Sequence, residues 1–292
     1  EAAKPGTFTV LSVGCGDGEL DQHLILALQE AAGSAGGDGA AHARPKVTKL
    51  HYVGLEPCRP DAAAFRARID AARAAGRLGP NAVAYVLEEA FEDRLRQPDE
   101  HRPDTPVFRS RTQFDLVVVA NALNYFRDPH AALQVRARAR AAPSRAASLT
   151  CAAAAAQRLV AQTKSGGRLL LVHPAARGVA EIQAELMRVV KGSEEHMCHA
   201  DELKRLLSLL RLQCATTHLH ARLNVSESLA RSSTGVQILS SILECDLRRL
   251  CERKMMRLLK TCWRLASIDE DGSAHVDETV AVFVVDKPLS RK

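Results

Sequence analysis

The sequence predicts an α/β protein built on a doubly wound, mostly parallel sheet of seven strands, with an antiparallel last strand and a small helical region. Three observations predict this class. An apolar run at residues 8–13 leads through closely spaced glycines into a helical pattern. Strand-like and helix-like segments then alternate up to residue 172. The last two strand-like segments lack a clear βα unit between them, which favours a final antiparallel pair.

The first strand and the turn after it organise the chain. The run Phe8–Val13 is apolar and β-branched, which is typical of a buried strand. Gly14, Gly16 and Gly18 follow, and without a Cβ they allow a tight turn and a ligand lying against the backbone. Apolar residues then recur at helical spacing: Leu20, Leu24, Ile25 and Leu28. The turn therefore opens into a helix N-terminus, whose free N–H groups favour a negative group.

The glycine spacing discriminates between nucleotide ligands. A dinucleotide fingerprint reads G-x-G-x-x-G, whereas this chain has G-x-G-x-G, so a nicotinamide dehydrogenase is disfavoured. Asp17 lies within the turn, and Glu19 and Asp21 follow it, so we expect a pyrophosphate to be repelled. These acids suit a cationic or zwitterionic ligand such as S-adenosylmethionine. A turn that binds no ligand is the alternative, because glycine-rich turns also arise for steric reasons.

Two further strands end in residues that suit a nucleoside. Leu50–Leu55 is followed by Glu56 and by a proline that ends the strand, so Glu56 stands at the edge where ligands bind in open α/β sheets. Its carboxylate can accept both ribose hydroxyls, and a solvated loop carboxylate is the alternative. The strand Val83–Leu87 leads to Phe91, which either packs against a base or belongs to the core.

The fourth strand leads to the predicted reactive centre. Phe114–Ala120 is followed by Asn121 and Tyr125, and we expect both side chains to face that centre. Residues 135–156 then consist largely of Ala, Arg and Ser, with almost no apolar periodicity. The sequence predicts a disordered insertion there, which interrupts a helix resumed at Gln157, and a mistaken exon boundary is the alternative.

The remaining segments are assigned to the substrate side. We predict strands at 168–172, 213–225 and 278–286, and helices at 179–190, 201–210 and 235–265. The last helical segment is a long helix or a helical pair whose apolar stripe belongs to the core, with a partner groove as the alternative. We predict a single domain over residues 1–292, with a cofactor-binding half at 7–172 and a substrate-side half at 173–292.

The composition of the chain limits the classes of partner that we expect the protein to bind. The net charge of +6 is compatible with nucleic acid, but the densest arginine cluster, residues 136–145, has no aromatic side chains for base stacking, so we expect no nucleic-acid partner. The eight cysteines form no C-x-x-C pair and mostly lie in apolar runs. We therefore predict no metal site and a reducing, cytoplasmic setting. No apolar run spans a bilayer and no signal peptide is visible, so we expect no membrane partner.

The motifs resemble those of class I S-adenosylmethionine-dependent methyltransferases, and more narrowly those of the histamine N-methyltransferase family. The segments that carry the resemblance are Leu11–Asp21, Leu55–Pro57, Phe114–Leu116, Leu123–Tyr125, the stretch from His199 to Glu227, and Thr279–Asp286. It covers nearly the whole chain apart from 33–45 and 135–156. The resemblance implies a Rossmann-like fold, S-adenosylmethionine as the cofactor, and a monomeric enzyme that methylates a small-molecule amine.

The resemblance also implies roles for individual residues. Four positions would lie along the cofactor, namely Gly14, Glu56, Asp61 and Ala120. Asn121 stands where the family has a glutamine that bonds the amine substrate, and Tyr125 matches an aromatic wall of the pocket. Glu278 stands where the family's closing strand opens with a substrate-binding asparagine, and Val179 and Asn124 replace two aromatic residues. The family also has a glutamate-bearing helix before the first strand, and this chain starts after that position.

The leading hypothesis is methyl transfer to a small amine. Asn121 and Tyr125 would orient the nucleophile, and Glu278 would stabilise the charge that develops on it. One alternative is a protein that binds S-adenosylmethionine without catalysis. Another is methylation of oxygen or sulfur, which needs a base, with His173 as the candidate. A histidine at the sheet rim without a catalytic role is the alternative for His173.

Overall fold

A computed structural model of the chain describes six ranges of residues, namely 6–34, 48–96, 112–123, 145–191, 198–243 and 245–288. The chain divides into two compact units. Unit 1 comprises residues 1–126, 155–171 and 284–292, and unit 2 comprises residues 127–154 and 172–283. Each unit is described by itself.

Unit 1 is built on the predicted parallel strands. They are β1 (Thr7–Val13), β2 (Lys49–Leu55), β3 (Ala82–Leu87), β4 (Phe114–Ala120) and β5 (Thr163–Pro174), the last of which enters unit 2 after Leu171. Their order in the sheet is β3-β2-β1-β4-β5. The pairs β1–β2, β1–β4 and β2–β3 are all parallel, as the sequence predicted.

The register of these strands aligns their carboxyl ends. Val13 of β1 pairs with Leu55 of β2 and with Val119 of β4, and Leu55 pairs with Leu87 of β3. Four strands therefore end side by side at one edge of the sheet. The residues that follow them begin the loops in which open α/β sheets bind their ligands.

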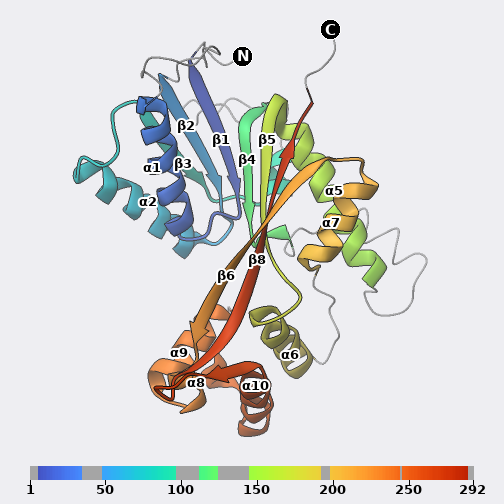
Figure 1. The fold of residues 1–292 in the computed structure, drawn as a ribbon. Helices are drawn as coiled ribbons and strands as arrows, with labels where there is room; N and C mark the ends of the chain where they lie inside the picture. Colours follow the sequence, from blue (N-terminus) through green and yellow to red (C-terminus); the bar gives the residue numbers. More distant parts are fainter. Residues whose placement is uncertain are drawn as a thin grey trace. The chain divides into compact units, whose positions relative to one another are not determined.

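Helices α1 (Glu19–Ser34) and α2 (Arg59–Ala74) pack against each other and against β2 and β3 (Figure 1). Their inward side chains complete the core of unit 1, in which Ile25, Tyr52 and Phe65 are at most 1% exposed. A short helix, α3 (Phe91–Arg96), follows β3 and was not predicted. This packing fixes the first turn of α1 and α2 at the carboxyl edge of the sheet.

Helix α5 (Arg145–Gln162) differs from the sequence-based expectation. It begins inside the segment 135–156, so residues 145–156 are helical instead of disordered. The physical reason is intrinsic propensity, because alanine is the best helix former and this segment contains a run of five alanines. Residues 135–144 lie outside the described residues.

Unit 2 contains the strands β6 (Cys214–Asn224), β7 (Ala266–Ile268) and most of β8 (Ala274–Asp286). β8 pairs with β6 and, in antiparallel register, with β7. The helical elements of the unit are α6 (Val179–Lys191), α7 (Ala200–Leu209), α8 (Ser226–Leu229), α9 (Ser233–Ile242), the 3₁₀ helix η2 (Leu247–Arg249) and α10 (Glu252–Leu265). The predicted helical pair at 235–265 is thus α9 and α10, whose apolar sides lie in one core with α6.

The described residues form a mixed α/β, Rossmann-like sheet with mostly parallel strands and an antiparallel C-terminal strand, as predicted. They contain eight strands instead of seven, because β7 was not predicted. β5 starts at Thr163, five residues before the predicted strand at 168–172, and includes the glycines Gly166 and Gly167. Backbone bonds between these glycines and Lys287 hold them in the sheet, at 2.9 Å for both Gly166 N to Lys287 O and Lys287 N to Gly167 O. Within the described ranges, no helix combines the length and apolarity that a membrane crossing requires.

Candidate functional site

The glycine turn after β1 lies directly beside the end of β2. The Gly14 N–H donates to Leu55 O at 2.8 Å, and the Gly18 N–H donates to Cys15 O at 3.1 Å. Gln22 N then bonds Gly18 O at 2.8 Å, which starts α1. The strand, turn and helix that the sequence predicted are therefore confirmed, and the N-terminus of α1 opens at the carboxyl edge of the sheet.

The three glycines of the turn all have positive φ, but they face different surroundings. A Cβ on Gly14 would lie 2.4 Å from Ala122 Cβ, and a Cβ on Gly18 would lie 2.2 Å from Phe65 Cδ2. A Cβ on Gly16, at φ +56°, would meet nothing within 4 Å. Gly14 and Gly18 are thus required by packing within unit 1, whereas Gly16 borders open space that a ligand can approach.

Glu56 holds the glycine turn and the start of α2 together. Its Oε2 accepts from Gly16 N and its Oε1 accepts from Cys58 N, both at 2.8 Å. The side chain is buried, with 7% exposed. A carboxylate oxygen has two lone pairs, so each oxygen keeps the capacity to accept one further hydrogen bond. The pair of acceptors that a ribose diol needs is therefore present beside Gly16, and its use for ribose stays a prediction.

The acids of the turn do not act as the sequence suggested. Asp17 is paired with Arg68 of α2, whose Nη2 donates to Oδ2 at 2.6 Å and whose Nε donates to the Asp17 carbonyl at 3.1 Å. Burial raises the pKa of Asp17, but the hydrogen bonds from Arg68 and from Glu19 N outweigh this effect and lower it. The expected repulsion of a pyrophosphate by Asp17 is therefore reduced by a cation 51 residues away in the sequence.

Asp21 points into the protein interior. It is 4% exposed and accepts from the Tyr52 hydroxyl at 2.6 Å. Burial raises the pKa of Asp21, while hydrogen bonds from Ser12 and Tyr52 oppose that rise. Burial also raises the pKa of Tyr52 well above its usual value, and so does the neighbouring Asp21 carboxylate. Asp21 therefore ties α1 to β1 and β2 and does not present its carboxylate to a ligand.

The start of α2 brings a second acid to Glu56. Glu56, Cys58 and Asp61 each have a potential ligand atom within 4.8 Å of the others. Such a group can hold a metal ion, and the sequence predicted none. Both oxygens of Glu56 already accept backbone N–H groups, and Cys58 is exposed, so the arrangement fits a polar organic ligand at least as well. Asp61 thus lies next to Glu56, as its predicted cofactor contact requires.

The end of β4 presents Asn121 next to the glycine turn. Ala120 ends the strand and is half-buried, and Asn121 is exposed with φ +54°. Asn is one of the few residues that adopt this left-handed conformation readily, and such backbone positions cluster at functional sites. The following Ala122 packs against Gly14. Asn121 therefore stands at the same edge as the predicted cofactor residues, whereas Tyr125 lies outside the described residues.

Phe91 lies in the core. Its side chain is 3% exposed at the first position of α3. Of the two interpretations of this residue, packing in the core is the one that the structure shows, and contact with a base stays a prediction. The burial follows from its position at the start of a helix that directly succeeds β3.

In unit 2, Glu278 of β8 caps the N-terminus of α6. Its Oε2 accepts from Val179 N at 2.8 Å, and a Cβ on Gly178 would lie 2.8 Å from the same oxygen. A carboxylate at a helix N-terminus is electrostatically favoured. Burial raises the pKa of Glu278, and the bond from Val179 N opposes the rise. Glu278 belongs to unit 2 and Asn121 to unit 1, so their joint action stays a prediction.

His173 of β5 is not a rim residue. It is 0% exposed, and its Nε2 lies 2.7 Å from the carbonyl oxygen of Cys198. Burial lowers the pKa of His173 to about 4, and the bond to Cys198 only partly opposes this. The ring is therefore neutral near pH 7 and enclosed, which gives it no direct access to a substrate.

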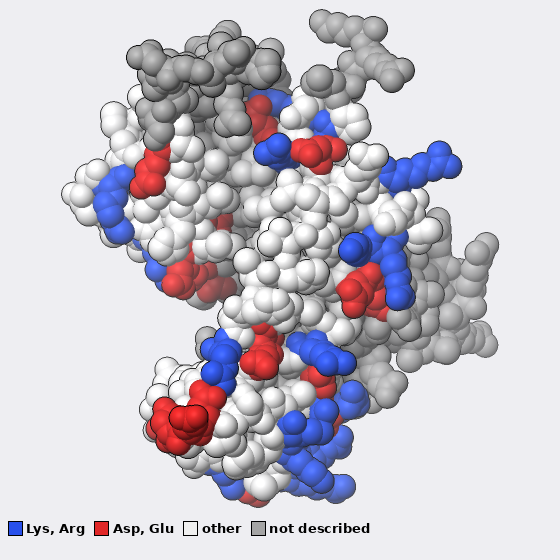
Figure 2. Space-filling model, in the orientation of Figure 1, with Lys and Arg blue, Asp and Glu red and all other residues white. Residues whose placement is uncertain are grey.

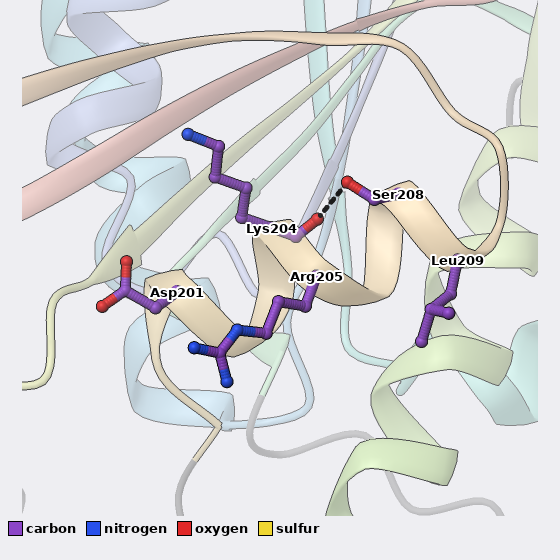
Figure 3. Close-up of a pocket in the computed structure, with 5 residues that line it drawn as sticks. All are labelled: Asp201, Lys204, Arg205, Ser208 and Leu209. Atoms are coloured by element: carbon purple, nitrogen blue, oxygen red, sulfur yellow. Dashed lines mark hydrogen bonds between the residues drawn. The ribbon is translucent and has the colours of Figure 1, made fainter.

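A pocket in unit 2 lies on α7 and contains none of the predicted site residues (Figure 3). Its lining residues are Asp201, Lys204, Arg205, Ser208 and Leu209. The Lys204 and Arg205 side chains extend in different directions, and the Ser208 hydroxyl bonds the Lys204 carbonyl at 3.0 Å within the same helix. Because these groups do not converge, the pocket does not compete with the glycine turn as the candidate site.

Charged side chains of both signs lie on the face shown in Figure 2, with uncharged areas between them. In unit 2, several arginines pair with carboxylates of neighbouring helices. Arg257 bonds Glu185 at 2.9 Å, and Arg264 bonds Glu181 at 3.1 Å. The charges of these two arginines are therefore balanced by carboxylates within unit 2.

Sequence reasoning missed two residues of the site, Arg68 and Tyr52. Arg68 lies on an amphipathic helix rich in Arg and Ala, where nothing in the spacing distinguishes it from its neighbours. Tyr52 lies within an apolar strand and reads as a core aromatic. The sequence offers one indication of such partners, namely the two acids Asp17 and Asp21. Carboxylates so close to a buried turn require hydrogen-bond or ion-pair partners elsewhere in the chain.

A comparison with known protein families identifies a family to which the chain is similar. A family model described as a methyltransferase domain matches residues 2–213, which is most of the chain. No curated protein matches the sequence significantly.

Similar solved structures include the YcgJ protein from Bacillus subtilis, at 15% identity and a TM-score of 0.48, with 98% of this chain and 94% of that chain covered. They also include the cyclopropane synthase MmaA2 from Mycobacterium tuberculosis, at 14% identity and a TM-score of 0.45, with 98% and 80% covered.

Proposed function

Because this chain belongs to the methyltransferase domain family, we propose that it transfers a methyl group from S-adenosylmethionine to a small-molecule amine. The observation that carries the proposal is the open position of Gly16 beside the Glu56 carboxylate, at the edge where four strands end in register. The cofactor, when bound, supplies an activated methyl group on a sulfonium.

The residues of unit 1 fit such a cofactor. Gly16 leaves room for close approach to the backbone, and the two Glu56 oxygens offer a diol two acceptors. Asp61 adds a carboxylate beside them. Asp17 is balanced by Arg68, whereas the carboxylates of Glu56 and Asp61 lie together at the ligand edge, and a ligand with cationic character suits that edge.

Asn121 orients the acceptor in this proposal. Its side chain is exposed at the end of β4, and its amide can donate to or accept from an amine. Methyl transfer is an in-line displacement, so alignment of the nucleophile is the main contribution of the protein. Two further roles rest on the sequence alone, namely stabilisation by Glu278 of the positive charge that develops on the nitrogen and an aromatic wall formed by Tyr125. Tyr125 matches an aromatic position of the histamine N-methyltransferase family, whereas Glu278 stands where that family has a substrate-binding asparagine.

An amine acceptor is favoured over oxygen or sulfur because a neutral amine needs no strong base. His173, the base candidate for the other acceptors, is enclosed and bonded to the Cys198 carbonyl. A small molecule is favoured over nucleic acid because no cluster of cations interleaved with aromatic residues is evident in the sequence.

Methyl transfer from labelled S-adenosylmethionine to a panel of small amines tests the proposal. Asn121→Ala should lower kcat about tenfold or more while the affinity for S-adenosylmethionine changes less than twofold. Loss of cofactor affinity in Asn121→Ala would refute the acceptor role of Asn121. Cofactor binding by the wild type without transfer to any amine would favour the non-catalytic alternative.

A further inference from the structure

We propose that Arg68 is a positioning residue for the cofactor, because it fixes the backbone of the glycine turn from helix α2. The inference rests on the proposed function and adds a residue that acts through Asp17. Arg68 donates through Nη2 to Asp17 Oδ2 at 2.6 Å and through Nε to Asp17 O at 3.1 Å. One guanidinium therefore holds both the side chain and the peptide carbonyl of a single residue.

The two bonds from Arg68 act on a segment whose backbone has high conformational freedom. Asp17 stands between Gly16 and Gly18, both of which have positive φ and few conformational restrictions of their own. The bond from Arg68 to the Asp17 carbonyl acts together with the bond from Gly18 N to Cys15 O to set the plane of the peptide between Asp17 and Gly18. Without it, the residues flanking the ligand edge could rotate, and cofactor binding would have to order them.

Two other contacts tie α2 to the same turn. Glu56 bonds both Gly16 N and Cys58 N at the start of α2, and Phe65 packs against Gly18 in the core. The Glu56 and Phe65 side chains are both buried, so substitutions there would also alter the packing of the turn. Arg68 differs because its pair with Asp17 is partly exposed, at 37% and 44% of the two side chains. Such a pair contributes only about 0–1 kcal/mol to stability.

The charge of Arg68 also acts on the turn. The Cys15 thiol lies among three carboxylates, and its pKa is raised by burial and then by Asp21, Glu56 and Asp17. Among the described residues, Arg68 is the cation that forms an ion pair with Asp17. Its removal would leave these carboxylates less balanced, and their repulsion would loosen the turn.

Calorimetric titration with S-adenosylmethionine and amide hydrogen exchange of the free protein test the inference. The variants are Arg68→Met, which keeps the apolar stem, and Arg68→Lys, which keeps the charge but lacks the fork. The matched control is Arg73→Met on the same helix, whose exposed pair with Asp70 at 3.1 Å touches no residue of the turn.

Arg68→Met should raise the Kd for S-adenosylmethionine about tenfold, the net contribution of roughly one charge-assisted hydrogen bond. The amides of Gly16 and Gly18, which donate to Glu56 and to the Cys15 carbonyl, should exchange faster before any ligand is added. The melting temperature should change no more than in Arg73→Met. Arg68→Lys should recover part of the affinity.

With an active enzyme, KM for S-adenosylmethionine should rise in Arg68→Met while kcat stays close to that of the wild type. Equal Kd values and equal amide exchange in Arg68→Met and Arg73→Met would overturn the inference and leave the proposed function intact. A wild-type protein that does not bind S-adenosylmethionine would overturn both.

Discussion

At the scale of single residues, the site depends on glycines that look alike in the sequence and differ in the structure. Gly18 and Gly76 both have positive φ, at +78° and +67°. A Cβ on Gly18 would meet the Phe65 ring at 2.2 Å, whereas a Cβ on Gly76 would meet nothing within 4 Å. A substitution at Gly76 therefore tests backbone strain alone, whereas a substitution at Gly18 tests backbone strain together with steric overlap.

We predict that Gly18→Ala lowers the free energy of unfolding by about 3 kcal/mol, because strain and overpacking both contribute. Gly76→Ala, with strain alone, should lower it by about 1 kcal/mol. Urea denaturation of the two variants measures the difference. Equal losses would show that Phe65 does not restrict Gly18.

His173 supplies a prediction about pH. Its pKa in the folded protein is about 4, below its usual value of 6.5. As pH falls through this window, the unfolded chain takes up a proton that the folded chain does not, so stability falls. The loss should total about 3 kcal/mol between pH 6.5 and 4. His173→Gln should remove that part of the pH dependence in urea denaturation, and an unchanged slope would contradict the prediction.

Some residues of the site could be predicted from the sequence and others could not. Glu56 and Asn121 were found because each follows an apolar strand, and strand ends define the ligand edge. Arg68 and the inward direction of Asp21 were missed because their partners, Asp17 and Tyr52, are 51 and 31 residues away. Local patterns carry no information about such pairs.

At the scale of elements, Glu278 joins a strand to a helix. It accepts from Val179 N at the first residue of α6, so its charge faces the positive end of the helix. A carboxylate that only caps a helix has no effect on turnover. The two roles of Glu278, cap and acceptor contact, are therefore separable by experiment.

We predict that Glu278→Gln lowers the free energy of unfolding by less than about 1 kcal/mol, since the amide oxygen still accepts from Val179 N. It should lower kcat about tenfold or more if the carboxylate stabilises charge on the amine. Urea denaturation and the labelled-methyl assay measure the two effects. An unchanged kcat would leave Glu278 as a helix cap alone.

Helices and strands were predicted well where apolar runs are bounded by loops. They were predicted less well in segments rich in glycine or alanine, where apolar periodicity is absent. β1 to β4 begin and end within one residue of the predicted strands. β5 extends through two glycines because its backbone bonds to Lys287 override their turn preference. The first part of α5, residues 145–156, was missed because its alanines have helical propensity but no apolar periodicity.

At the scale of the whole molecule, the strand alternation predicted the sheet, and the register of the sheet assembles the candidate site. The strands β3, β2, β1 and β4 end side by side, because their register aligns Leu87, Leu55, Val13 and Val119. The loops that follow these strands therefore lie at one edge although they are far apart in the sequence. Gly16, Glu56, Asp61 and Asn121 all lie in these loops or at the helix that follows. The central claim is that this edge binds S-adenosylmethionine through Glu56.

Calorimetric titration of S-adenosylmethionine into the wild type, Glu56→Gln and Asp70→Asn tests that claim most directly. Each Glu56 oxygen accepts one backbone N–H group at 2.8 Å and can accept one further hydrogen bond from a diol, and glutamine replaces one of these oxygens with an NH₂ group that cannot accept. The wild type and Asp70→Asn, an exposed control on α2, should bind with equal affinity, and Glu56→Gln should bind at least about tenfold more weakly. A wild type that does not bind, or a Glu56→Gln that binds as tightly as the wild type, would contradict the account.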